Sequence, residues 1–224
     1  MEHFKKTHTV LAPDLRGHRH GPSGPGPWMT GHFAEDLKQL MVEKNMDKAV
    51  ICGLSMGGYV ALHFAQQYPE MVDALVLCDT QADADSNEAK DKRFATIQKI
   101  QKDGLTAFAQ DFSKNVLAEN TLTQNPEIQK KVISMIVENK QQDVVMNLGT
   151  LASRRDSNPF LTEFRFPTLI IVGSEDKVTP LTVSQKLAAG IQNSTLKIVE
   201  KAGHLSNLEQ PLIFNGYLEA FLTK

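Results

Sequence analysis

Short apolar runs alternate with longer amphipathic stretches at both ends of the chain. Runs of four or five residues that are nearly continuous in apolar side chains are typical of parallel strands covered on both faces. The stretches between them repeat apolar residues every three or four positions, which is typical of helices. The alternation predicts an α/β fold with a mainly parallel sheet of about five strands. These strands are expected at residues 9–13, 49–52, 74–78, 168–172 and 195–199.

The middle of the chain follows a different pattern. Residues 81–167 contain no strand candidate, and a coil of that length is uncommon in a compact domain. Apolar residues recur there with helical spacing in three stretches, from Phe94 to Leu105, from Ile128 to Ile136 and from Val144 to Leu151. We therefore expect a helical cap, residues 81–167, inserted into an α/β core made of residues 1–80 and 168–224.

Composition narrows the class of protein further. The chain has 224 residues, of which 41% are hydrophobic, and a net charge of -2. This suits one globular domain and gives no electrostatic footprint for nucleic acid or an anionic membrane. No apolar run approaches the roughly 20 residues that span a bilayer, and the N-terminus has no apolar stretch typical of a secretory signal. Cys52 and Cys78 lie inside predicted strands, and two buried free thiols indicate a cytoplasmic protein.

A Gly-x-Ser-x-Gly motif stands between a predicted strand and a predicted helix. Ser55 is its centre and follows the strand that ends at Cys52. So sharp a reversal strains the serine backbone, needs small neighbours, and exposes the hydroxyl at the end of the strand. The backbone N–H of Met56 then points to where an oxyanion would form. The alternative is an incidental serine in a glycine-rich turn.

A serine nucleophile needs a base and an acid that orients the base. Asp176 and His204 follow the fourth and fifth predicted strands, so both are expected at the sheet edge that carries Ser55. The order Ser, Asp, His predicts a catalytic triad, which implies no metal and no cofactor. Two other carboxylates compete with Asp176. Glu175 is adjacent but would point the other way in an extended loop, and Asp79 ends the third predicted strand.

Four segments together carry a family resemblance: residues 12–18, the serine motif at 52–58, the loop with Asp176, and residues 202–211. They resemble the α/β-hydrolase superfamily, in particular its bacterial branch of 3-oxoadipate enol-lactonases and small carboxylesterases. The resemblance implies a hydrolase that cleaves a small carboxylic ester or lactone through an acyl-enzyme. Ser55 would be acylated, His204 would act as base and then acid, and the helical cap would select the substrate.

The chain departs from that family at its N-terminus. Relatives usually begin earlier, and their third strand ends in a His-Gly loop that donates the second oxyanion N–H. Loss of one such donor costs about 2.7–4 kcal/mol of transition-state stabilisation. A catalytically weak or inactive hydrolase-like binding protein is therefore the alternative function. A chain truncated at its start, or a naturally shortened enzyme, would equally account for the missing loop.

The missing third strand also affects the expected sheet. Residues 9–13 would pair directly with residues 49–52 and keep the right-handed crossover. One face of the sheet would lose a covering helix, and an apolar sheet edge would stay open. We expect the protein to form a homo-oligomer that covers this edge.

Two clusters of charged or ligating side chains have open interpretations. Arg154, Arg155 and Asp156 would supply a cation for a carboxylate-bearing substrate, or would end a solvated helix. His18 and His20 share a loop, but no carboxylate or cysteine stands at ligand spacing. A solvated loop is therefore favoured over a metal site.

Overall fold

The computed structural model describes residues 2–24 and 26–223. Within these residues, the centre is a four-stranded sheet in the order β1-β2-β3-β4, and every neighbouring pair is parallel. Because all strands run the same way, their C-terminal ends lie at one edge of the sheet, where open α/β sheets carry their sites. The strands are β1 (Ala49–Leu54), β2 (Val72–Cys78), β3 (Thr168–Gly173) and β4 (Ser194–Val199).

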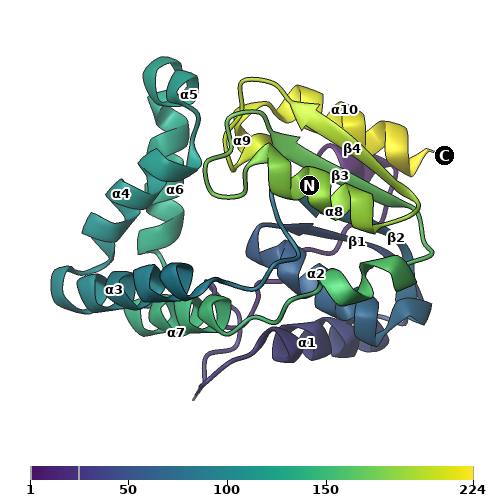
Figure 1. Ribbon diagram of the computed structural model, residues 1–224, viewed down its shortest axis with the longest axis horizontal. Helices are drawn as coiled ribbons and strands as arrows, with labels where there is room; N and C mark the ends of the chain where they lie inside the picture. Colours follow the sequence, from purple (N-terminus) through teal and green to yellow (C-terminus); the bar gives the residue numbers. More distant parts are fainter. Residues whose placement is uncertain (1, 25, 224) are drawn as a thin grey trace.

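Helices cover both faces of the sheet (Figure 1). One face packs against α1 (Thr30–Glu43), α2 (Met56–Gln67) and α8 (Leu181–Gly190), and the other packs against α10 (Pro211–Leu222). Shorter turns are η1 (Phe4–Lys6), η2 (Pro69–Met71) and α9 (Ser206–Glu209). Across the described ranges, no helix combines the length and hydrophobicity that a membrane span needs.

The chain between β2 and β3 forms a helical layer beside the sheet, on the left in Figure 1. Its helices are α3 (Asn87–Asp103), α4 (Leu105–Val116), α5 (Glu119–Gln124), α6 (Pro126–Val137) and α7 (Gln141–Ala152), and the 3-10 helix η3 (Asn158–Glu163) follows. We call α3 to α7 the helical insertion. Apolar spacing predicted three of these helices, α3, α6 and α7, whereas α4 and α5 were not expected.

The two segments that lead into and out of the helical insertion lie side by side. The backbone N–H of Ser157 donates to the carbonyl of Ala82 at 2.8 Å. Arg154 forms an ion pair with Asp85 at 2.5 Å, and both side chains are only 3% exposed. The two chain connections between the sheet and the insertion thus run next to each other.

The strand expected at residues 9–13 is not formed. This stretch has no regular structure and makes none of the backbone hydrogen bonds found in the described part of the chain. Its apolar run does not help, because a strand needs a neighbour that satisfies its N–H and C=O groups. β1 pairs with β2 alone, so the predicted pairing with residues 49–52 is wrong. The sheet of the described residues therefore has four strands rather than five.

β1 is consequently an edge strand, and one of its faces is bare. Val50 is 38% exposed and Cys52 is exposed, whereas Ile51 on the opposite face is buried. The register places Cys52 beside Val76, on the face that α10 covers. α10 packs against β3 and β4 and leaves this part of β1 open. The prediction of a buried thiol is therefore right for Cys78 and wrong for Cys52.

Candidate active site

Ser55 occupies a strained turn between β1 and α2. Its φ of 51° and ψ of -114° are unusual for a residue with a side chain. Its amide donates to the carbonyl of Cys78 at 2.9 Å, and its carbonyl accepts from Thr80 Oγ1 at 2.9 Å. Both partners lie at the end of β2, so the neighbouring strand holds the turn in this conformation.

The glycines around Ser55 are required for different reasons. A Cβ atom on Gly53 would lie 2.1 Å from the carbonyl oxygen of Gly57, so a side chain there would force the turn apart. A Cβ atom on Gly58 would lie 2.4 Å from Thr80 Oγ1, whereas one on Gly57 would meet open space. The expected need for a small residue before Ser55 is confirmed at Gly53. After Ser55, the residue that must be small is Gly58 and not Gly57.

His204 connects Ser55 with Asp176. Its Nε2 lies 2.7 Å from Ser55 Oγ, and its Nδ1 lies 2.8 Å from Asp176 Oδ2. Because a carboxylate only accepts, Nδ1 carries the proton and Nε2 accepts from the serine hydroxyl. His204 is 2% exposed and Asp176 is 6% exposed, so the hydrogen bonds between them are shielded from bulk water. The structure brings together the three residues that the sequence singled out.

The turn after β3 fixes the carboxylate of Asp176. Its Oδ1 accepts from the backbone N–H groups of Val178 and Thr179 at 2.8 and 2.9 Å, and Oδ2 accepts from Thr179 Oγ1 at 2.7 Å. Burial raises the pKa of Asp176, but the hydrogen bond and charge of His204 and the bonds from Thr179 outweigh burial. The pKa therefore lies below its ordinary value, and the carboxylate is ionised at neutral pH. Glu175 is exposed.

Asp79, the other competitor for the acid position, is bonded elsewhere. Its Oδ1 accepts from the backbone N–H of Gly173 at 2.8 Å, and its Oδ2 accepts from Ser206 Oγ at 2.5 Å. The side chain is fully buried, and this burial raises the pKa of Asp79 to about 7. Asp79 therefore ties the end of β2 to the loops that carry Asp176 and His204.

Met56 is the first residue of α2. The first N–H groups of a helix have no acceptor within the helix, and the helix dipole makes this end attractive to negative charge. The amide of Met56 follows Ser55 directly, so it is suited to an oxyanion formed at the serine. Among the described residues, no group of three or more His, Cys, Asp and Glu side chains is arranged to hold a metal.

Several polar residues around the site were missed at the sequence level. Each lies in a segment that was singled out for another residue, and each is buried while making hydrogen bonds. Sequence carried no usable signal for them, because a polar residue in a loop is ordinarily solvated and its burial is set by tertiary packing. They are Thr179, Ser206 and Glu209.

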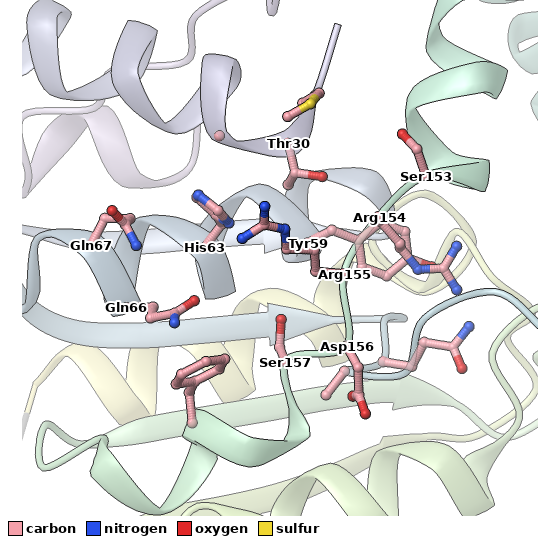
Figure 2. Close-up of a pocket in the computed structure, with 15 residues that line it drawn as sticks. Thr30, Tyr59, His63, Gln66, Gln67, Ser153, Arg154, Arg155, Asp156 and Ser157 are labelled. Carbon is pink, nitrogen blue, oxygen red and sulfur yellow. The ribbon is translucent and has the colours of Figure 1, made fainter.

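A cavity of about 550 Å³ lies between the start of α1, one face of α2 and the segment after α7 (Figure 2). Its lining includes His63, Arg154 and Arg155 but none of Ser55, Asp176 and His204. Arg154 is buried, forms an ion pair with Asp85, and has its guanidinium 4.4 Å from the ring centre of Tyr59. The interpretation as a solvated helix end is therefore wrong for Arg154.

Comparison with known proteins assigns the family. A family model described as the alpha/beta hydrolase fold matches residues 1–211, so the chain belongs to the α/β-hydrolase fold family. This membership confirms the fold class and the hydrolase family that the sequence motifs predicted.

Individual relatives show where within the family the similarity lies. A 3-oxoadipate enol-lactonase of Acinetobacter baylyi is 29% identical over 224 residues, which are 100% of this chain and 82% of the relative. The structure of a thermophilic esterase from Thermogutta terrifontis is 32% identical with a TM-score of 0.95, covering 99% of this chain and 82% of that one. An enol-lactonase from Burkholderia xenovorans LB400 shares the fold, with a TM-score of 0.86 and 24% identity over 94% of this chain and 79% of its own.

Proposed function

We propose that this chain is a serine hydrolase that cleaves a small carboxylic ester or lactone through an acyl-enzyme. The observation that carries the proposal is the hydrogen-bonded series Ser55, His204 and Asp176, with separations of 2.7 and 2.8 Å, at the C-terminal edge of a parallel sheet. Similarity to proteins named enol-lactonase and esterase supports this substrate class.

In the proposed acylation, His204 Nε2 takes the hydroxyl proton of Ser55 while Oγ attacks the carbonyl carbon of the substrate. The carbonyl oxygen becomes an oxyanion that the Met56 N–H stabilises, and Asp176 stabilises the imidazolium. When the intermediate collapses, the bond to the alcohol oxygen breaks and His204 returns its proton to that oxygen. An ester releases the alcohol, whereas a lactone keeps it attached as a hydroxyl of the acyl chain.

In the proposed deacylation, water takes the place of the alcohol. His204 removes one proton from water as the oxygen attacks the acyl carbon, and Ser55 then leaves with that proton. One water molecule is consumed, and a carboxylic acid and an alcohol are formed. In this scheme the helical insertion covers the site and selects the acyl and alcohol groups.

The test is hydrolysis of p-nitrophenyl acetate and p-nitrophenyl butyrate by this chain, with Ser55→Ala as the blank. We expect turnover in the wild type and a loss on the order of 10⁶-fold in kcat in the variant, as when a triad serine is removed. Ser134→Ala, at an exposed position of α6, is the matched control and should keep full activity. A small lactone followed by acid release distinguishes lactonase from esterase preference.

Equal turnover by the wild type and Ser55→Ala would contradict the proposal. A folded wild-type chain with no turnover would instead favour the alternative of a hydrolase-like binding protein. Location in the cytoplasm and the division into a core and a cap stay predictions.

A further inference from the structure

Glu209 is a buried carboxylate at the junction between the helical insertion and the loop that carries His204. It is 8% exposed and ends α9. Its Oε2 accepts from the backbone N–H of Ala118 at 2.8 Å and from Thr121 Oγ1 at 2.6 Å. Its Oε1 accepts from the backbone N–H of Gly203 at 2.8 Å, directly before His204. One side chain thus bonds both to the insertion and to the histidine loop.

Further contacts hold the same junction together. The backbone N–H of His204 itself donates to the carbonyl of Val116, at the end of α4, at 2.8 Å. Gly203 lies so close to the insertion that a Cβ atom there would be 2.7 Å from the nitrogen of Ala118. An apolar cluster that includes Val116, Leu117, Leu205 and Leu208 surrounds these bonds. The contacts with Val116 and Ala118 of the insertion therefore help to fix the backbone of Gly203 and His204.

The junction lies at the α4–α5 end of the insertion, away from the segments that connect α3 and α7 to the sheet (Figure 1). Those connecting segments keep the insertion attached whether or not this end is docked. The docked α4–α5 end supplies the acceptor of the His204 N–H, the carbonyl of Val116. It also supplies two donors to Glu209, which in turn accepts from the N–H of Gly203.

We propose that Glu209 is a positioning residue that couples docking of the helical insertion to the placement of His204. This inference rests on the proposed function, because it takes His204 as the base that activates Ser55. When the α4–α5 end lifts, the His204 N–H loses its acceptor on Val116 and Glu209 loses two of its three donors. The imidazole then loses its fixed distance to Ser55 Oγ. The serine is then reactive only while the insertion covers the site.

A glutamine in place of Glu209 tests this chemistry with almost no change in size. Three N–H or O–H donors converge on the carboxylate, and its two oxygens accept all of them. A glutamine amide keeps one accepting oxygen and turns an NH₂ group towards the remaining donors. Glu119→Gln is the matched control, because Glu119 is an exposed glutamate in the first turn of α5.

Thr121→Val supplies a second test from the insertion side. It is isosteric and removes one donor to Glu209 while leaving the bonds from Ala118 and Gly203 in place. Thr121 has no hydrogen bond to the triad within the described chain. An effect of this variant on Ser55 is therefore transmitted through Glu209.

Three measurements are made on each full-length variant. They are kcat and KM for p-nitrophenyl acetate, the rate at which phenylmethylsulfonyl fluoride sulfonylates Ser55, and amide hydrogen exchange at residues 116–121 and 203–206. For Glu209→Gln we expect kcat and the sulfonylation rate to fall together by about 10- to 100-fold, since a displacement of about 1 Å costs up to 10²-fold. KM should change less, and both segments should exchange faster. Thr121→Val should show smaller changes in the same direction, and Glu119→Gln should match the wild type.

Faster exchange with unchanged sulfonylation, or slower sulfonylation with unchanged exchange, would overturn the coupling. If Glu209→Gln fails to fold, Thr121→Val decides by the same criteria. A wild-type chain that hydrolyses no ester would defeat the proposed function alone, because exchange and sulfonylation still report on the junction.

Discussion

The two sides of Ser55 differ in how the backbone is held. Towards β3 and β4, the loops that carry Asp176 and His204 are tied to buried carboxylates, Asp79 from the sheet and Glu209 from α9. Away from them, β1 is a bare edge with Val50 exposed, and residues 9–13 form no strand. A buried, fully bonded polar group fixes geometry because breaking it leaves an unsatisfied partner, whereas an exposed edge has water as an alternative. The loops of Asp176 and His204 are therefore held more tightly than the β1 edge, which is expected to tolerate substitution better.

The largest effect is expected on the rigid side, from loss of the acid. Asp176→Asn keeps the shape of the side chain but favours the wrong imidazole tautomer, so kcat for p-nitrophenyl acetate should fall about 10⁴-fold. Glu175→Gln changes the adjacent exposed carboxylate and should leave kcat unaltered. If kcat, measured at saturating substrate, fell by a similar factor in both variants, the assignment of the acid to Asp176 rather than Glu175 would be contradicted.

Asp79 should make stability depend on pH. Its pKa is raised from 3.8 to about 7, so between these values the folded protein holds a proton that the unfolded chain has released. The free energy of unfolding therefore contains a contribution that is complete below pH 3.8 and is lost as the pH rises through 7, by about 4 kcal/mol. Asp79→Asn lacks it.

Urea unfolding from pH 4 to pH 8 measures this contribution as the difference between the wild type and Asp79→Asn. That difference should shift by several kcal/mol in favour of the variant as pH rises. Asp73→Asn alters an exposed position of the same strand and should follow the wild type. If the difference in the free energy of unfolding stayed constant with pH, the pKa of Asp79 would not be raised in the folded protein.

In the turn at Ser55, which lies between the two sides, substitution of two glycines of one motif should have different effects on stability. Gly53→Ala forces a methyl group against the Gly57 carbonyl, and overpacking of this kind costs typically 1–3 kcal/mol. Gly57→Ala places its methyl group in open space and should be neutral, or stabilising by up to about 1 kcal/mol. Thermal unfolding of both variants checks the order, and an equal cost would contradict the close approach at Gly53.

The smallest change in stability is expected at the β1 edge. Val50→Lys should alter the free energy of unfolding by no more than about 0.5 kcal/mol, because the side chain is already 38% exposed. The expected self-association through this edge should weaken, since a charged side chain opposes edge-to-edge pairing. Sedimentation velocity at micromolar concentration measures this, and a wild type that is purely monomeric would remove the self-association hypothesis.

The proximity of Ser55, Asp176 and His204 was predictable because each follows a strand, and parallel strands bring their C-terminal ends to one edge. Four of the five expected strands formed, since their apolar runs found neighbours. The run at 9–13 looks the same in sequence but lacks a partner, which only the assembled sheet reveals. The exposure of Cys52 and the burial of Cys78 have a similar cause. Both lie on the face of the sheet that α10 covers, but α10 packs over β3 and β4 and does not extend over β1.

The polar residues that support the triad were not predictable from local pattern. Thr179, Ser206 and Glu209 act through partners that are set by tertiary packing, in some cases far away in the chain. Glu209 meets Thr121 across 88 positions of sequence. Apolar periodicity reports burial of one face of an element, but it carries no information on which donors converge on a buried carboxylate.

Because the chain enters and leaves the helical insertion side by side, at Ala82 and Ser157, the insertion can be exchanged as one unit. A replacement segment needs two ends that meet where Ala82 and Ser157 meet, so its length does not affect the sheet. If the insertion selects the substrate, as proposed above, recombination at these two ends would exchange the substrate range in a single event. The exchange has one condition, namely that the new segment presents donors to Glu209.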